Sequence, residues 1–284
     1  MAVGGGHGQA ASLRAARRFA GHLTAVVSVA DDGGSTGRLR AAVPRPAPGD
    51  LRKCLVAMAG SSSPLARAME HRFAKGELDG HAFGNLLIAA LEESEGDLVS
   101  ALDDIGDLLG AVGRVLPVTT APVELRATVD SGALVRGQVA VAARPDLRSV
   151  MIEPADAPAC ADAVAAIEAA DQIVLGPGSL YTSVLAATAV AGVRDALERA
   201  PGQLVYICNL RPQVSETGGY GVDDHVAALH RHGVEPDVVL YDPGTIDGAD
   251  GVPGAVPARL ARPSGLAHDP VLLGEALVEQ IRAR

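Results

Sequence analysis

Short apolar runs alternate with segments of helical periodicity along most of the chain. An apolar start at 1–3 runs into a glycine-rich turn, and the residues from 9 to 20 then repeat their apolar positions at helical spacing. A second apolar run follows at 23–27. This order predicts a strand, a glycine turn, a helix and a second strand. The polar stretch "SVADDGGSTGRLR", 28–40, is expected to form a loop at the end of that second strand.

Helical patterns dominate the next part of the chain. The second of them opens at Ser63-Pro64, a capping residue followed by proline at the first helical position. We expect a helix-rich insertion between early strands, with helices at 49–60, 63–76, 81–96 and 97–113.

The pattern changes at 115–142, where short β-branched runs are broken by proline and Ser-Gly and polarity alternates. Such a segment favours antiparallel hairpins, so we predict a small β appendage there. Strands and helices then alternate again, and "DGADGVPGAVP" at 247–257 is expected to be a loop. The predicted strands are 149–154, 172–179, 203–209 and 237–242, and the predicted helices are 158–170, 180–189 and 222–232.

This alternation predicts an α/β fold: a Rossmann-like, doubly wound, mostly parallel sheet with helices on both faces. Composition agrees, because 48% of residues are hydrophobic, Trp is absent, and only three Phe and four Tyr occur. A core of Val, Leu, Ile and Ala suits buried parallel strands. A length of 284 residues is compatible with one large domain, which we take as 1–284.

Charge and cysteine usage exclude several classes of protein. The net charge of −10 argues against a surface for the nucleic acid backbone, although a local basic pocket for one phosphate remains possible. No run reaches the ~18 to 20 apolar residues of a membrane span, and the start lacks the features of a signal peptide. Cys54, Cys160 and Cys208 show no metal-ligand or CxxC spacing. We expect buried thiols in a cytoplasmic protein.

Glycine-rich and polar sequences follow the carboxyl ends of the predicted strands, where ligands bind in sheets of this kind. "GGGHG" would let backbone N–H groups approach a phosphate at a helix N-terminus. It lacks the Lys-Ser/Thr of a P-loop and the GxGxxG register, so a tight packing turn is the alternative. "GPGS" at 176–179 repeats the design. Two such turns at one sheet edge favour an anion or nucleotide site.

Asp31, Asp32 and Asp50 could hold a divalent cation, bind a sugar hydroxyl or cap turns. Arg38 and Arg40 could neutralise a phosphate or lie in solvent. His81 and Asn85 are four residues apart, and they share a helix face if that helix begins early. The chain contains no GxSxG or HExxH motif, and Ser179 fits a phosphate-binding hydroxyl better than a nucleophile.

Seven motifs follow one another along the chain: "GGGHG", "VVSVADDGGSTGRLR", "PAPGDLRKCLVAMA", "GHAFGNLLIAAL", "IVLGPGSLYTSVL", "CNLRPQVSETGGYGVDDHV" and "HDP" at 268–270. In this order they resemble the YvcK family, the gluconeogenesis factors, which are distantly similar to the CofD family of 2-phospho-L-lactate transferases. The resemblance covers essentially the whole chain. It implies a Rossmann-like fold, a cytoplasmic location and binding of a UDP-sugar such as UDP-N-acetylglucosamine. It also implies a role in cell shape and cell-wall precursor supply during gluconeogenic growth.

Matching motifs assign the expected ligand-binding residues, to which the residue-level reasoning adds Arg38. In the family the first turn is usually GGGTG and a basic residue precedes HDP, whereas this chain has His7 and Ala267, with Arg262 as the substitute we expect for the basic side chain. The expected residues are Gly5, Gly6, Gly8, Asp32, Arg38, Asn85, Gly178, Ser179, Asn209, Gln213 and Glu216.

Three functions remain open at this point. The first is a regulatory UDP-sugar-binding protein without turnover, acting on an unidentified protein partner, with the homo-oligomer and the monomer both open. The second is a CofD-like phospho-group transferase with Mg²⁺ held by Asp32 and Asp50. The third is an NAD(P)-binding protein, which an acidic residue at the end of the second strand favours and the glycine register does not.

Overall fold

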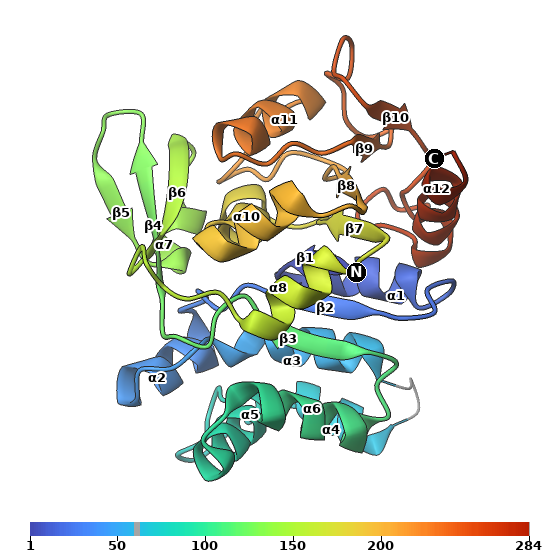
Figure 1. Cartoon of the computed structure of the whole chain (residues 1–284). Helices are drawn as coiled ribbons and strands as arrows, with labels where there is room; N and C mark the ends of the chain where they lie inside the picture. Colours follow the sequence, from blue (N-terminus) through green and yellow to red (C-terminus); the bar gives the residue numbers. More distant parts are fainter. Residues whose placement is uncertain (60–62, 284) are drawn as a thin grey trace.

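A parallel sheet of seven strands forms the centre of the computed structural model, which describes residues 1–59 and 63–283 (Figure 1). The strand order is β10-β9-β8-β7-β1-β2-β3. From the central pair β1 and β7, the strands β2 and β3 follow in one direction and β8, β9 and β10 in the other. The predicted Rossmann-like α/β class is therefore confirmed. The strands are β1 (Ala2–Gly4), β2 (Thr24–Val27), β3 (Arg114–Pro117), β7 (Gln172–Leu175), β8 (Gln203–Ile207), β9 (Val238–Tyr241) and β10 (Ala255–Pro257).

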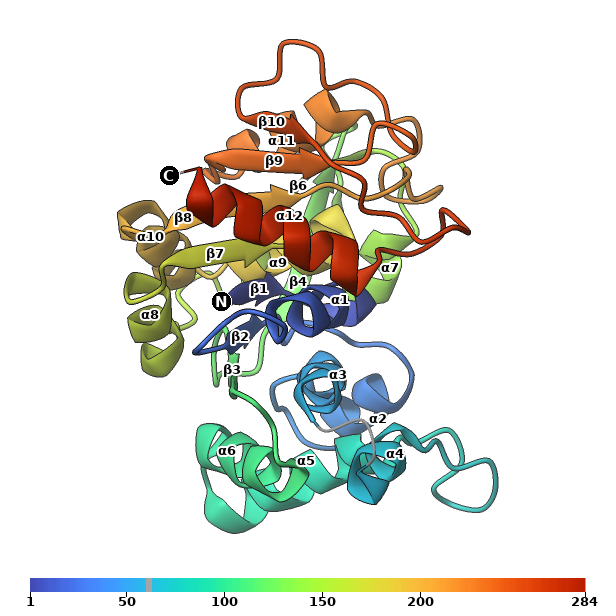
Figure 2. The ribbon, with the colours of Figure 1, turned by 90° about the vertical axis from the view of Figure 1, so that its right-hand side faces the viewer.

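Helices cover both faces of this sheet, as Figures 1 and 2 show. On one face lie α1 (Gly6–Ala16), α3 (Pro48–Met58) and α12 (Pro270–Arg282). On the other lie α8 (Ala161–Glu168), α10 (Ala191–Arg199) and α11 (Val222–Arg231). The central strands are buried on both sides, which explains their continuous Val, Ile and Leu runs.

The predicted helical insertion between β2 and β3 is present. It contains α2 (Gly34–Ala42), α3, α4 (Pro64–Glu70), α5 (Phe83–Glu95) and α6 (Leu98–Leu109). Ser63 caps α4 by accepting a hydrogen bond from Ala66 N at 3.3 Å, as its Ser-Pro start predicts. α4 ends at Glu70, well before residue 76, and Gly60 of the predicted helix 49–60 lies outside the described residues. None of the described helices is long and apolar enough to cross a membrane.

The polar stretch 28–40 is only partly the loop that we expected. Extended backbone continues to Gly33, and α2 then begins at Gly34, whose φ of +48° suits glycine. Gly37 N donates to Gly33 O, so "STGRLR" is helical. The glycines here turn the chain sharply from β2 into a helix, rather than extending a mobile loop.

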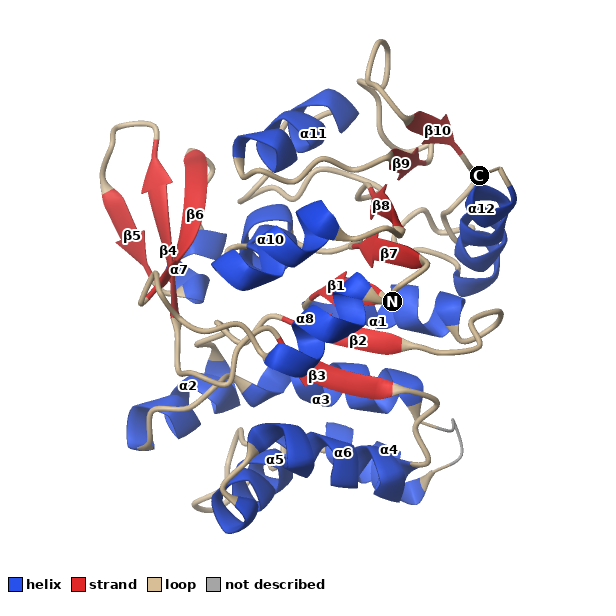
Figure 3. Cartoon of the chain, viewed as in Figure 1, coloured by secondary structure: helices blue, strands red, loops and turns tan. Residues whose placement is uncertain are grey.

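The β appendage is real, but the predicted boundaries of 115–142 are wrong. It is an antiparallel sheet of order β5-β4-β6 with one short helix, α7 (Gln138–Ala142) (Figure 3). β4 is Glu124–Val129, β5 is Leu134–Arg136 and β6 is Leu147–Glu153. β3 instead joins the main sheet, because its last three residues are buried. The strand predicted at 149–154 as part of the parallel sheet is β6, whose alternating burial matches a sheet with one solvated face.

The chain leaves and re-enters the main fold at neighbouring points around this appendage. Cys160 N donates to Val118 O at 3.0 Å, which closes the excursion just beyond β3. β6 and α7 pack against the π-helix Leu180–Leu185, which occupies the first part of the predicted helix 180–189 and continues as α9 (Ala186–Thr188). The appendage is therefore tied to the main fold at its base and along one side.

Three elements near the end of the chain were not predicted. α10 and α12 carry clear helical periodicity, and β10 lies at the end of the loop expected at 247–257. β10 pairs with β9 in parallel as the edge strand of the sheet, a position where a Pro-containing strand is tolerated. The three cysteines are buried and free, as expected.

Candidate functional site

Two adjoining cavities lie beyond the carboxyl ends of β1 and β7, the point where the strand order reverses. The larger, of about 780 Å³, we call the arginine pocket, and the smaller, of about 280 Å³, the carboxylate pocket. His7, Gly8, Gly178 and Gln213 line both cavities. Ligands of doubly wound sheets bind at this switch point, so the two cavities form the candidate site.

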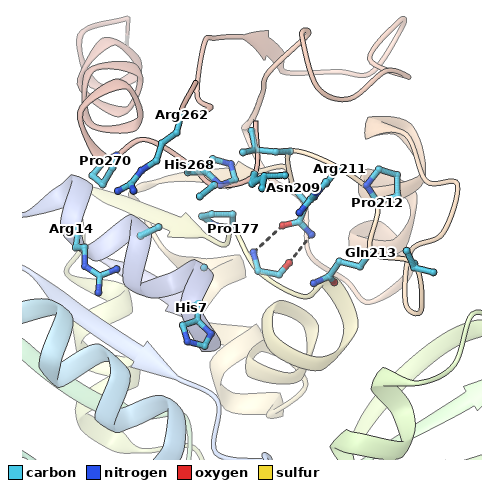
Figure 4. Close-up of a pocket in the computed structure, with 17 residues that line it drawn as sticks. His7, Arg14, Pro177, Asn209, Arg211, Pro212, Gln213, Arg262, His268 and Pro270 are labelled. Carbon is cyan, nitrogen blue, oxygen red and sulfur yellow. Dashed lines mark hydrogen bonds between the residues drawn. The ribbon is translucent and has the colours of Figure 1, made fainter. Parts of the chain in front are cut away.

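The arginine pocket takes its name from Arg14, Arg211 and Arg262, which come from α1, the segment after β8 and the segment before α12 (Figure 4). No Asp or Glu lines it, although the whole chain carries a net charge of −10. The three guanidinium groups make no hydrogen bond or ion pair with the side chains or backbone of the described residues. Their charge is thus available to an anionic ligand.

His268 adds a neutral polar group to the wall of the arginine pocket. Burial lowers the pKa of His268 to about 4, although a backbone contact with Cys208 and the charge of Asp242 act in the opposite direction. Its Nε2 atom is buried and has no partner among the described residues. At neutral pH His268 is therefore an uncharged imidazole with one ring nitrogen still available for a hydrogen bond.

Asp242, at the end of β9, holds the segment that carries Arg262 and His268. Its Oδ2 atom accepts hydrogen bonds from Leu260 N at 2.8 Å and Ala261 N at 2.9 Å. Burial raises the pKa of Asp242, but the backbone donors Leu260, Ala261 and Gly244, together with His268, lower it by more, so the net shift is downward. The carboxylate thereby fixes one wall of the arginine pocket.

We expect Asp242→Ala to lower the free energy of unfolding by about 2 kcal/mol at pH 7, since it leaves buried backbone donors without an acceptor. Because the folded-state pKa is depressed, this contribution is present above about pH 4 and is lost as the pH falls further. Urea titrations at pH 7 and pH 3 test this. The expectation fails if parent and variant differ as much at pH 3 as at pH 7.

The carboxylate pocket contains Asp31 and Asp50, with Lys53 beside them. Lys53 Nζ donates to Asp50 Oδ1 at 2.9 Å. Burial raises the pKa of Asp31, and the neighbouring Asp50 raises it further, whereas hydrogen bonds from Gly33 and Thr36 lower it. The pocket also meets the N-terminus of α1, where Gly5 is the N-cap and no side chain caps the helix. The helix dipole therefore adds positive potential at this end.

The glycines of "GGGHG" allow very close packing around these cavities. A Cβ atom on Gly8 would lie 1.9 Å from Pro177 O, and one on Gly5 would lie 2.7 Å from Asp50 Oδ2. The packing interpretation of this motif therefore applies, and its approach to a phosphate stays a prediction. It is a packing turn at Gly8, and it also lines both pockets.

Side chains after β8 hold the "GPGS" turn in place. Gly178 N donates to Asn209 Oδ1 at 3.1 Å, and Asn209 Nδ2 donates to Gly178 O at 2.8 Å, the pair of bonds drawn in Figure 4. Gln213 Nε2 donates to Ser179 Oγ at 3.1 Å, while the buried Gln213 Oε1 has no partner among the described residues. Asn209 and Gln213 thus hold the "GPGS" turn against the segment that follows β8.

Most of the expected ligand-binding residues line these cavities, but Asp32, Arg38, Asn85 and Glu216 do not. Asp32 faces the appendage, where its Oδ1 accepts a hydrogen bond from Val139 N at 2.9 Å. Asp31, not Asp32, shares the carboxylate pocket with Asp50. Arg38 is exposed and lines neither cavity. The expected residues that line a cavity are Gly5, Gly6, Gly8, Asp50, Gly178, Ser179, Asn209 and Gln213, together with Arg262.

Asn85 and Glu216 are buried and line neither cavity. Asn85 Oδ1 accepts a hydrogen bond from Arg52 Nε at 3.0 Å. Glu216 accepts hydrogen bonds from the backbone N–H groups of Tyr181 and Thr182, at the start of the π-helix. α5 begins only at Phe83, so His81 precedes the helix and does not share a face with Asn85.

Sequence reasoning missed Arg14, Arg211, His268, Lys53 and Gln138. Arg14 lies seven residues after His7, which places both on one face of α1, so this spacing could have revealed it. Gln138 reaches the carboxylate pocket from α7 in the appendage. Nothing in the local sequence around Gln138 indicates that position.

The transferase hypothesis requires Mg²⁺, so the side chains that could bind this ion must match its ligand preferences. Within residues 1–59 and 63–283, no cluster of three or more His, Cys, Asp or Glu side chains could hold a metal ion. Asp31 and Asp50 together fit a Mg²⁺ bound by two carboxylates and completed by phosphate oxygens and water. Any such ion would therefore depend on a phosphorylated ligand.

Comparison with known proteins shows the same architecture elsewhere. The family model for 2-phospho-L-lactate transferase CofD matches residues 1–251. A crystal structure from Bacillus halodurans, described as a member of the UPF0052 family, superposes with a TM-score of 0.91 at 32% identity, covering 98% of this chain and 97% of the other. Fold and site thus define an α/β protein of the CofD type.

Curated relatives identify the family more closely. The chain is 37% identical over 246 residues to the gluconeogenesis factor of Halalkalibacterium halodurans, covering 85% of this chain and 76% of the relative. It is 44% identical over 256 residues to a relative with that family name from Mycobacterium tuberculosis, covering 85% and 74%. The chain belongs to the gluconeogenesis factor family. It spans 54% of the length of a further relative, from Deinococcus radiodurans, at 43% identity.

Proposed function

We propose that this chain is a cytoplasmic regulatory protein that binds a UDP-sugar, of the UDP-N-acetylglucosamine kind, without turning it over. Its bound state would act on a protein partner in the control of cell shape and cell-wall precursor supply during gluconeogenic growth. The observation that carries the proposal is the arginine pocket. Within the part of the chain that the structure describes, it has three guanidinium groups without a partner and no carboxylate in its lining, at the edge where doubly wound sheets bind nucleotides.

The size of the pocket agrees with such a ligand. Its volume of about 780 Å³ lies within the ~300–1,000 Å³ of pockets that hold small molecules and cofactors. A diphosphate would meet the arginines, and the uncharged His268 supplies a further hydrogen-bonding group. The three arginines and His268 would thus fix the orientation of a bound nucleotide.

The absence of turnover is supported by the state of the nucleophilic side chains. Burial raises the pKa of the Cys54, Cys160 and Cys208 thiols, which disfavours the reactive thiolate. Ser179 Oγ accepts a hydrogen bond from an amide, Gln213 Nε2, rather than facing a base. These groups suit binding better than covalent catalysis.

A CofD-like phospho-group transferase is the second candidate, and the carboxylate pocket favours it. Asp31 and Asp50 would hold a divalent cation against phosphate oxygens, and the cation would stabilise charge developing during transfer. Lys53, which contacts Asp50, would add positive charge beside the transferred group. This reaction would need the metal for turnover.

Isothermal titration calorimetry with UDP-N-acetylglucosamine, UDP-glucose, NAD and GTP, each with Mg²⁺ and with EDTA, separates these functions. We expect saturable binding of the two UDP-sugars in both conditions and no binding of NAD or GTP. Binding of GTP only with Mg²⁺ would favour the transferase. Binding of NAD alone would favour the NAD(P)-binding alternative and contradict our proposal.

A further inference from the structure

The second cavity and the appendage suggest how the site distinguishes its ligand, an inference that rests on the proposed function. The carboxylate pocket, at about 280 Å³, is much smaller than the adjoining arginine pocket of about 780 Å³, so it suits one part of a ligand that spans both. Asp31 and Asp50 accept hydrogen bonds and therefore favour a group that offers O–H donors. A sugar has such groups, and the arginine pocket next to it takes the phosphates.

One wall of the carboxylate pocket comes from the appendage. Gln138, the first residue of α7, is the one appendage side chain among the described residues that lines this cavity. Its amide can donate and accept hydrogen bonds, unlike the carboxylates on the opposite side. Gln138 therefore has the chemistry to recognise a hydroxyl or acylamino group of a sugar.

Asp32 fixes the position of α7 relative to the main fold. Its Oδ1 atom accepts a hydrogen bond from Val139 N at 2.9 Å, at the residue next to Gln138. The other oxygen, Oδ2, packs so closely against Gly137 that a Cβ atom there would lie 2.4 Å away. The φ of +86° at Gly137 is also one that glycine accepts readily.

Other contacts also anchor α7. Gly137 N donates to Leu125 O at 2.8 Å, which joins α7 to β4, and Val141 is fully buried. These contacts hold α7 to the appendage and to the core. Asp32 is the residue after Asp31, so its backbone is continuous with a wall of the carboxylate pocket.

We propose that the carboxylate pocket is the sugar subsite, that Gln138 determines its specificity, and that Asp32 is the positioning residue that holds Gln138 over it. The two adjacent aspartates then have different roles. Asp31 faces the ligand, and Asp32 holds the appendage that closes over the ligand.

Calorimetric affinities for UDP, UDP-glucose and UDP-N-acetylglucosamine test this proposal. Gln138→Ala is expected to weaken binding of at least one UDP-sugar by about 5- to 10-fold, the effect of a lost hydrogen bond, and to change UDP binding by less than about twofold. Asp32→Ala is expected to give the same pattern and faster hydrogen exchange at 137–142. Asp32→Asn keeps an oxygen acceptor for Val139 N, so it should restore much of the discrimination.

Leu134→Ala provides the matched control, because Leu134 is an exposed appendage side chain, on β5, that lines neither cavity. It should bind all three ligands like the parent. Equal losses for UDP and the UDP-sugars in Gln138→Ala, or equal affinity of the parent for all three ligands, would overturn the sugar subsite and leave nucleotide binding standing. A parent that binds none of them would overturn both proposals.

Discussion

Gly8→Ala is expected to prevent folding or to lower the free energy of unfolding by more than about 4 kcal/mol, in the exceptional range for a single substitution. The added Cβ atom would lie 1.9 Å from Pro177 O, 2.4 Å from Pro177 C and 2.7 Å from Gly178 Cα. All three are backbone atoms of the turn after β7, so no rotamer change can relieve the clash. α1 would have to move away from the sheet.

Urea denaturation followed by circular dichroism measures this effect. Gly106→Ala is the matched control, since Gly106 is also a helical glycine and the nearest atom to its Cβ position is 4.0 Å away. We expect Gly106→Ala to be neutral or to stabilise by up to about 1 kcal/mol, through helix propensity. A Gly8→Ala variant as stable as the parent would contradict the close approach of α1 and the turn.

The double substitution Arg211→Ala/Arg262→Ala is expected to weaken UDP-sugar binding by about 100-fold. Each hydrogen bond to a charged group contributes about 1.5–3 kcal/mol, and a factor of ten in affinity is about 1.4 kcal/mol. Two lost contacts therefore account for this factor even if their effects are not fully additive. The affinity that remains would come from Arg14 and the N-terminus of α1.

A control for net charge accompanies this experiment. Lys75→Ala/Arg136→Ala removes two positive charges from exposed positions that line neither cavity. Calorimetry should show nearly unchanged affinity for this variant and a weaker salt dependence for Arg211→Ala/Arg262→Ala. If the two double variants lose affinity to the same extent, the arginine pocket does not bind the phosphates.

Periodicity predicted most of the main sheet because its strands are buried on both faces and read as continuous apolar runs. It failed at β6, whose sequence "SVMIEP" contains a short apolar run that is equally compatible with a parallel strand. The partner of a strand depends on contacts between distant residues, here Leu125 with Ile152, which no local pattern contains.

The sequence predicted the glycine and amide residues that follow the strand ends and line the cavities. It predicted less well which of the charged side chains line them. Asp31 and Asp32 are identical side chains in adjacent positions, and only the course of the backbone sends one to the carboxylate pocket and the other to Val139. Arg211 and Arg262 come from segments far apart in the sequence. Their convergence follows from the strand order β9-β8-β7 and not from spacing.

The appendage starts and ends at neighbouring backbone positions, Val118 and Cys160, at the rim of the main sheet. A segment attached in this way can be exchanged between relatives as a cassette, because a change within it leaves the register of the parallel strands intact. Under the proposed function, replacing this cassette would alter the recognised sugar, while the arginines of the other pocket stay under separate selection. The same property makes 119–159 a practical unit for grafting new ligand preferences onto this fold.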